Sequence, residues 1–330
     1  MKQTRRDVIK TTGGALVGYT LQSDYKMSKI QEQMHGEMDS NQLLANCWMH
    51  SGGTTPFRGA HGQREWSPLS LERRAQQLSN AGFSAIGLYH SDIENQINNN
   101  FDASNRRESL QQMKTVLEDN GINYVMLEFL VNWILDEDDP RREAERETRE
   151  LLLETADILG ADHIKIGNIN GYPREVGDIR RKFADISDEF AQVDTQVGLE
   201  FFPVDPNINT IADAMEITEG IDNGGLYLDL WHNVKMDIDF NEIANLSSGD
   251  VVGAEFQDGY IDTNMSFIEE TINLRKIPGE GEFPISDWIS ATRESGFDEP
   301  FALEILSEEY RRLSIEVAYQ KAHDGGSQFL

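Results

Sequence analysis

The chain has 330 residues, with 58 acidic against 29 basic side chains and a formal net charge of −29. Only 10 of the basic residues are lysine, a balance that predicts a halophile's protein, of haloarchaeal type, with an ordinary acidic cytosolic protein as the alternative. This charge excludes a nucleic-acid partner, which requires a basic face, and no basic amphipathic stripe indicates membrane binding. The single cysteine, Cys47, excludes a disulfide framework and a multi-cysteine zinc site.

The N-terminal segment, residues 1–40, differs from the rest of the chain in charge. Four basic residues lie within its first ten positions, and residues 4–10 resemble a twin-arginine export signal. The apolar stretch that follows, 13–21, is too short to span a bilayer and leads to no small-residue cleavage site. We therefore expect a cytoplasmic protein with a tail over 1–40, and export by the twin-arginine pathway as the alternative.

From residue 43 onward, short apolar runs alternate eight times with longer amphipathic stretches. This alternation predicts a single-domain (β/α)8 TIM barrel over 41–323, followed by a C-terminal tail over 324–330. The runs lack strict two-residue alternation, as expected for parallel strands covered on both faces. A doubly wound open sheet is the competing fold, but its glycine-rich phosphate fingerprint is absent. The predicted strands cover 43–49, 84–89, 123–130, 163–167, 197–202, 225–230, 251–256 and 301–305, and the predicted helices cover 71–81, 109–120, 141–159, 174–193, 210–220, 284–295 and 308–322.

Six of the predicted strands carry a charged residue inside an apolar run. Such a charge is costly unless it is paired or bound to a metal, and one lysine cannot match all the carboxylates of this set. In a barrel these positions converge at the carboxyl ends of the strands, where active sites are built. All-oxygen ligands suit a hard divalent ion such as Mn²⁺ or Mg²⁺. The residues are Glu128, Lys165, Glu200, Asp229, Glu255 and Glu304.

Four segments near the strand ends share a family pattern: Gly198-Leu199-Glu200, Asp229-Leu230-Trp231-His232, Pro278-Gly279-Glu280-Gly281-Glu282, and the run from Gly296 to Glu304. On these segments the chain resembles the xylose-isomerase-like barrel superfamily, in its sugar phosphate isomerase/epimerase branch, over about 43–322. The resemblance implies one divalent metal held by a Glu, an Asp, a His and a Glu from strands five to eight. The matching positions are Glu200, Asp229, Glu255 and Glu304; Glu255 replaces the family's histidine, and Gln257 is the second choice.

Further residues are candidates for the substrate pocket. The family's Asp-x-x-His pattern implies that His232 contacts a substrate oxygen. Arg275 precedes the glycine-containing loop and suits a substrate oxyanion or phosphate; a surface arginine paired with local acid is the alternative. Glu128 and Lys165 are candidate pocket-lining groups, or else a structural ion pair. Two histidines at strand ends, His50 and His90, are further candidates to line the mouth of the pocket. Three tryptophans near strand ends could form an apolar wall against a sugar ring: Trp48, Trp133 and Trp231.

The activity implied by the resemblance is isomerisation or epimerisation of a sugar or sugar phosphate. The metal would stabilise an enediolate, while Glu200 and Glu304 remove and return the proton. Loss of a β-hydroxyl on the same site would give an inosose- or dehydroshikimate-type dehydratase. A non-catalytic barrel that has lost the metal is the third alternative, because Glu255 stands where the family has a histidine ligand. The expected partner is a small sugar or polyol. Assembly of the chain into a homo-oligomer is a further expectation.

Overall fold

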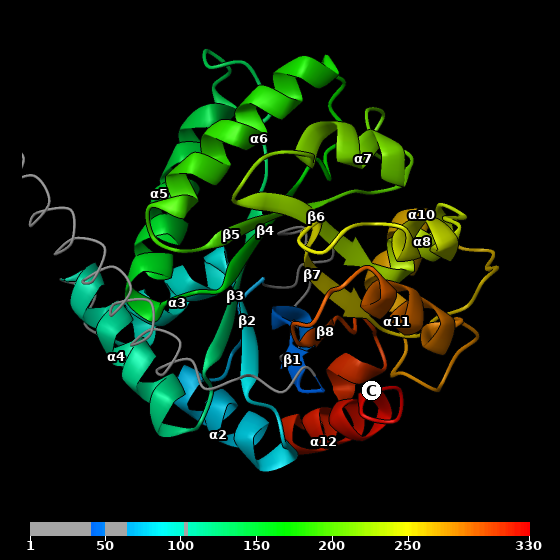
Figure 1. The fold of residues 1–330 in the computed structure, drawn as a ribbon. Coiled ribbons are helices and arrows are strands. Elements are labelled where there is room, and N and C mark those ends of the chain that lie inside the picture. The colour runs from blue at the N-terminus through cyan, green and yellow to red at the C-terminus, as the bar shows by residue number, and fades with distance from the viewer. Residues whose placement is uncertain (1–40, 50–64, 102–104) are drawn as a thin grey trace, which may run out of the picture. The chain divides into compact units, whose positions relative to one another are not determined.

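The computed structural model describes residues 41–49, 65–101 and 105–330. Eight parallel strands in these residues pair in chain order, and β8 returns to β1 to close a barrel (Figure 1). The predicted (β/α)8 barrel is therefore confirmed. The tail, its export motif and His50 lie outside the described residues. The strands are β1 (Leu43–Ala45), β2 (Ala85–Tyr89), β3 (Tyr124–Leu130), β4 (His163–Gly167), β5 (Gln196–Glu200), β6 (Gly224–Asp229), β7 (Val251–Phe256) and β8 (Phe301–Leu303).

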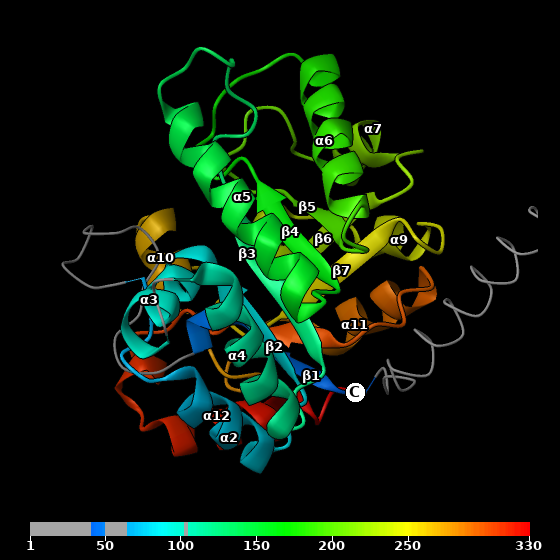
Figure 2. The same cartoon turned by 90° about the vertical axis from the view of Figure 1, so that its left-hand side faces the viewer.

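Helices surround the strands and cover their outer face (Figures 1 and 2). The helix predicted at 71–81 is found with those bounds: the Ser70 hydroxyl accepts the Arg73 N–H at its start, and Gly82 adopts the left-handed conformation at its end. The helices are η1 (Cys47–Met49), α2 (Leu71–Ala81), α3 (His90–Asn100), α4 (Arg106–Asp119), α5 (Arg141–Leu159), α6 (Val176–Ala191), α7 (Ile211–Thr218), α8 (Leu230–Lys235), α9 (Phe240–Ala244), α10 (Phe267–Asn273), α11 (Ile285–Glu294), η2 (Tyr310–Arg312) and α12 (Ile315–Gly326).

The first strand is shorter than predicted, because Asn46 turns the chain. Its side-chain oxygen accepts the Trp48 N–H at 3.0 Å, and its carbonyl accepts the Met49 N–H at 3.1 Å. The prediction of a strand over 43–49 was therefore wrong beyond Ala45, where the short helix η1 follows. This turn places the Asn46 side chain at the end of β1.

The last predicted helix, 308–322, is divided into two elements. The short helix η2 ends before Ser314, whose backbone is extended, and α12 begins at Ile315. Helix α12 continues to Gly326, four residues past the predicted end at 322. Beyond it, the ring of Phe329 packs against that of Phe256, with 6.5 Å between the ring centroids.

Four helices in the connections that follow strands were not predicted: α3, which has 11 residues, and the shorter α8, α9 and α10. Helix α8 starts directly after β6, with the Asp229 carboxylate accepting the Trp231 N–H as its N-cap. Among the described residues, no helix combines the length and apolar character that crossing a bilayer requires.

The apolar core lies between the barrel and its helices. Ile86, Leu127, Ile164 and Leu199 on four neighbouring strands are fully buried. Burying such a side chain contributes roughly 1.5–3 kcal/mol, so this layer is a rigid support for the charged groups that follow it along the strands.

Candidate active site

The charged residues of the strands meet at one end of the barrel. Parallel pairing aligns Glu128 with Lys165 and Asp229 with Glu255. Glu200 ends β5, and Glu304 directly follows β8. These six side chains are buried, and the structure brings them together as the sequence predicted. They form a polar cluster at the carboxyl ends of six consecutive strands, the end at which barrel enzymes build their sites.

The Lys165 ammonium lies among four carboxylates. Its Nζ is 2.8 Å from Glu255 Oε1, 3.1 Å from Glu304 Oε1, 3.1 Å from Glu128 Oε2 and 3.7 Å from Glu200 Oε2. Burial opposes the charge, but the four carboxylates outweigh it and raise the pKa of Lys165 well above its ordinary range. The predicted Lys165–Glu128 pair exists as one arm of this larger cluster.

Arg275 is the second cation of the cluster. Its guanidinium NH1 lies 3.0 Å from Asp229 Oδ2 and 2.7 Å from Glu304 Oε2, and it stacks 5.3 Å from the centre of the Trp231 ring. Burial opposes its charge, yet Asp229 and Glu304 prevail and raise the pKa of Arg275. The site therefore holds two permanent positive charges against five carboxylates.

Asp229, Glu255 and Glu304 have every carboxylate oxygen engaged. The Trp231 N–H and the Gln257 amide donate to Asp229 Oδ1 at 2.7 Å each. The side chains of Asn46 and Tyr227 donate to Glu255 Oε2 at 3.2 and 3.0 Å. The remaining oxygens contact a cation: Glu255 Oε1 and Glu304 Oε1 contact the Lys165 ammonium, and Asp229 Oδ2 and Glu304 Oε2 contact the Arg275 guanidinium. Burial raises the pKa of Glu255, and repulsion by Glu304 adds to it.

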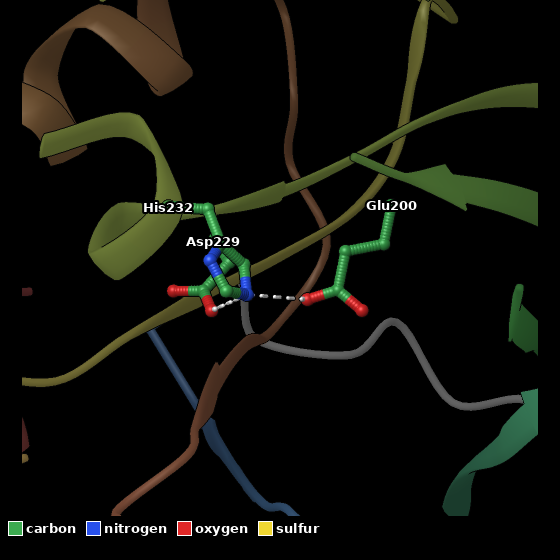
Figure 3. A group of neighbouring side chains, drawn as sticks. All are labelled: Glu200, Asp229 and His232. Atoms are coloured by element: carbon green, nitrogen blue, oxygen red, sulfur yellow. Dashed lines mark ion pairs between the residues drawn. The ribbon is translucent and has the colours of Figure 1, made fainter. Parts of the chain in front are cut away.

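Glu200 and His232 form a less constrained pair (Figure 3). The His232 Nε2 lies between the two carboxylates, 3.3 Å from Asp229 Oδ2 and 3.6 Å from Glu200 Oε1. Burial lowers the pKa of His232 well below its usual value, and Arg275 lowers it further, so the imidazole is neutral near pH 7. Burial likewise raises the pKa of Glu200, against the opposing effect of Lys165.

A cavity of about 220 Å³ opens onto this cluster. Six of the nine predicted site residues line it, whereas Asp229, Glu255 and Gln257 lie behind them. An aromatic wall, made of Trp48, Phe129, Phe202 and Phe267, also lines the cavity, and the centre of the Phe202 ring lies 4.8 Å from that of His232. The cavity therefore combines charged groups with aromatic surface, which suits a small polar molecule with an apolar face. The six are Glu128, Lys165, Glu200, His232, Arg275 and Glu304.

Two of the three tryptophans expected at the pocket lie elsewhere. Trp133 is buried and donates to the Gly167 carbonyl, and Trp231 donates to the Thr271 hydroxyl. His90 accepts the Phe129 N–H at 3.4 Å outside the cavity, and burial lowers its pKa to about 4.

Sequence reasoning missed the hydrogen-bonding partners of Glu255 and most of the aromatic wall. Asn46 directly follows β1, as Glu304 directly follows β8. Its position at the carboxyl end of a strand could therefore have marked it as a residue of the site. Phe129 and Phe202, at the ends of β3 and β5, obey the same rule. Tyr227 carried no such signal, because an aromatic residue inside a strand is usually part of the core.

The assembled fold and site agree with a match of residues 75–324 to the xylose isomerase-like TIM barrel family. The chain belongs to this family. Its curated relatives include a 3-dehydroshikimate dehydratase from Pseudomonas aeruginosa, 23% identical over 259 residues, which are 73% of this chain and 37% of the relative. An inosose isomerase from Halalkalibacterium halodurans is 28% identical over 156 residues, which are 44% of this chain and 54% of the relative. The chain thus spans between a third and about half of these relatives.

Solved structures of the family share the barrel. The IOLI protein, solved with a bound zinc atom, has a TM-score of 0.70 at 20% identity, over 88% of this chain and 99% of that one. A D-psicose 3-epimerase from Clostridium cellulolyticum H10, solved with D-tagatose, has a TM-score of 0.61 at 13% identity, over 87% of this chain and 98% of that one. At these identities the likeness concerns the fold.

Carboxylates of the acidic cluster and the His232 imidazole lie close enough together to hold a divalent metal ion. Within the part of the chain that the structure describes, two groups of side chains are close enough to hold one ion. One consists of Glu200, Asp229 and His232, and the other of Asp229, Glu255 and Glu304. Of the four predicted ligands, Asp229 therefore belongs to both groups, Glu200 to the first, and Glu255 and Glu304 to the second, with His232 as an additional member of the first.

The first group fits a divalent ion better than the second. His232 is neutral, as a ligand must be, and the cation nearest to Glu200, Lys165, stays 3.7 Å away, beyond hydrogen-bond distance. Asp229 is the engaged member of this group, because Arg275 lies 3.0 Å from its Oδ2. In the second group, every oxygen already accepts a donor within 3.2 Å. An ion at Glu255 and Glu304 would have to displace Lys165.

Proposed function

We propose that this protein is an isomerase or epimerase of a sugar or a related polyol, acting by proton transfer at a carbon next to a carbonyl. The observation that carries this is the Glu200 carboxyl, which lines the cavity with a raised pKa beside two cations and a neutral imidazole. A carboxyl whose pKa is shifted towards neutrality can both take and return a proton. The family and its epimerase and isomerase members support the proposal.

The remaining groups have separate roles in this proposal. Glu200 removes the proton and, in isomerisation, returns it to the neighbouring carbon. In epimerisation Glu200 gives its proton to solvent, and Glu304, on the same cavity, passes a proton taken from solvent to the carbon. Lys165 and Arg275 attract the substrate oxygens that gain negative charge, and the His232 imidazole hydrogen-bonds a hydroxyl. A divalent ion held by Glu200, Asp229 and His232 would add Lewis-acid polarisation of the carbonyl. The aromatic wall contacts the apolar face of the sugar.

Solvent deuterium exchange tests the proposal. Purified protein, with and without added Mn²⁺, is incubated in D₂O with a panel of ketoses and inososes, and mass spectrometry and NMR detect label at carbon. We expect label with at least one substrate, and a loss of about 100-fold or more in Glu200→Gln. Glu316→Gln, an exposed acid on α12, is the matched control and should exchange like the unmodified protein. Exchange that persists in Glu200→Gln contradicts the role of Glu200.

Dehydration is the second candidate, because the 3-dehydroshikimate dehydratase relative aligns with 73% of this chain. In that reaction the proton is also removed next to the carbonyl, but the β-hydroxyl then leaves as water. The same assay distinguishes the two, since dehydration produces an ultraviolet-absorbing enone or diketone and isomerisation does not. A sugar-sized partner, cytoplasmic residence with twin-arginine export as its alternative, and homo-oligomer formation stay predictions.

A further inference from the structure

The Lys165 ammonium lies against carboxylates that are candidate metal ligands, which is an unusual position for a lysine. Its side chain is 2% exposed, and its ammonium contacts Glu255 and Glu304, two of the four positions at which the family resemblance implies metal ligands. The Tyr227 ring lies 4.9 Å from Nζ on another side. The ammonium is therefore enclosed in the cluster and does not reach it from the surface.

A divalent ion and this ammonium cannot share the same oxygens. Glu255 Oε1 and Glu304 Oε1 each accept Lys165 Nζ, at 2.8 and 3.1 Å. An ion bound to those two atoms would bring two positive charges into contact in a buried, low-dielectric site, where their repulsion is strong. The other oxygen of Glu255 accepts hydrogen bonds from the side chains of Asn46 and Tyr227, and the other oxygen of Glu304 contacts the Arg275 guanidinium. Neither carboxylate can therefore rotate without losing one of these contacts.

The replacement of the family's histidine fits this arrangement. A histidine at position 255 would be a neutral ligand and would give Lys165 no countercharge. Glu255 instead supplies a carboxylate, to which Lys165 makes its shortest contact. The acid on β7 and the lysine on β4 thus form a cross-barrel pair between residues 90 positions apart in the chain.

We propose that the Lys165 ammonium and a divalent ion compete for Glu255 and Glu304, so that Lys165 limits the affinity of the barrel for the ion. While Lys165 stays in place, the ligands left to the ion are Glu200, His232 and Asp229, whose Oδ2 the ion would have to take over from Arg275. The inference rests on the proposed function only in placing a divalent ion in this barrel. It assigns Lys165 as the resident cation of the cluster.

Calorimetric titration of purified protein with Mn²⁺ tests this competition. Removing the ammonium in Lys165→Met frees one oxygen each of Glu255 and Glu304 and also takes the cation from Glu128 and Glu200. We expect Mn²⁺ to bind at one equivalent with a Kd about 10- to 100-fold lower than in the unmodified protein. Lys165→Arg keeps the charge and should show no gain. Lys182→Met removes a lysine that pairs with Glu137 outside the barrel, and its Kd should not change. A Kd in Lys165→Met equal to or higher than in the unmodified protein overturns the proposal.

Lys165→Met leaves buried carboxylates without their cation, so it can fail to fold in the absence of metal. The double variant Lys165→Met with Glu255→Gln removes one charge of each sign and leaves the net charge of the cluster unchanged. Because Glu304 is still freed, its Kd for Mn²⁺ should lie below that of the unmodified protein and above that of Lys165→Met. A double variant that binds Mn²⁺ no more tightly than the unmodified protein also overturns the proposal.

The titration measures binding and not turnover, so its result is separable from that of the proposed function. Tighter Mn²⁺ binding in Lys165→Met, without deuterium exchange on any substrate, supports the competition and contradicts the isomerase. Exchange in the unmodified protein, without a gain in Mn²⁺ affinity in Lys165→Met, supports the isomerase and contradicts the competition.

Discussion

The Asp258 carboxylate accepts the backbone N–H of Gly281 at 2.9 Å, and this contact fixes the loop that follows Arg275. The same carboxylate accepts the N–H groups of Gly259, Gly279 and Phe283 at 2.8–3.0 Å. One buried acid thus organises the Pro-Gly-Glu-Gly-Glu segment. A Cβ at position 281 would lie 2.4 Å from Asp258 Oδ1, which is why the close approach requires glycine.

Replacing Asp258 should destabilise the fold strongly. Asp258→Ala leaves four backbone donors without their acceptor, and hydrogen bonds to a charged group contribute about 1.5–3 kcal/mol each, so we expect a loss of at least about 3 kcal/mol in the free energy of unfolding. Asp258→Asn retains an acceptor oxygen and should lose less. Urea unfolding at constant salt measures both, with the exposed Asp222→Ala as control. A loss in Asp258→Ala no larger than in the control contradicts the role given to Asp258.

A methyl group at Gly167 should disturb the site more than the fold. Gly167 pairs with Glu200 in the sheet, and an added Cβ would lie 2.6 Å from both the Glu200 carbonyl oxygen and the Phe202 ring. The strand that carries Glu200 must shift, and a displacement of about 1 Å can cost 100-fold in rate. We expect Gly167→Ala to lower kcat/KM of the deuterium-exchange reaction by tenfold or more.

The matched control is Gly177→Ala at the start of α6. A Cβ there meets nothing within 4 Å, and alanine is the better helix former. Its exchange rate should be unchanged and its unfolding midpoint equal or higher. Equal exchange rates in Gly167→Ala and Gly177→Ala would show that the Gly167–Glu200 spacing does not position the base.

The stability of the protein should depend on the protonation of Asp162. Its carboxyl accepts the Val125 N–H at 2.9 Å. Burial, with a smaller contribution from the nearby Glu299, raises the pKa of Asp162 to about 7 and outweighs the Val125 hydrogen bond, which lowers it. In the unfolded chain an aspartate titrates near 3.9. A raised pKa means that the folded state takes up a proton, so this contribution is present below about pH 4 and is lost as pH rises through about 7.

Asp162→Asn keeps the acceptor and removes the titration. The two proteins should therefore unfold with similar free energies near pH 4, and the variant should become the more stable one as pH rises towards 8. Urea unfolding at pH 4, 5, 6, 7 and 8 measures this difference. Parallel profiles of the two proteins across that range would show that Asp162 is ionised in the folded state.

The barrel and its charged cluster were predictable because each depends on a local pattern. Strand–helix alternation specifies the fold, and a carboxylate inside an apolar run, such as Glu200, marks a position where the strand enters a polar site. The pairing within the cluster was not predictable. Which of four carboxylates Lys165 contacts depends on the reach of its four-carbon stem and on barrel closure between residues as distant as 165 and 304.

The misplaced elements have a similar explanation. The turn at Asn46 ends β1 through one side-chain hydrogen bond, whereas the apolar residues beyond it continue the strand pattern. The unpredicted helices α8 and α9 have six and five residues, too few to show a full amphipathic period.

The burial of Lys165 and Arg275 separates the site from the ionic conditions that act on the rest of the molecule. Charges at the surface attract and repel one another through water, and added salt screens them over about 10 Å at 0.1 M. The two buried cations are 2% and 1% exposed, so their contacts are little affected by screening. Salt should therefore alter the solubility and surface repulsion of this acidic chain strongly, while the affinity of the cavity for an uncharged substrate stays nearly constant from dilute buffer to brine.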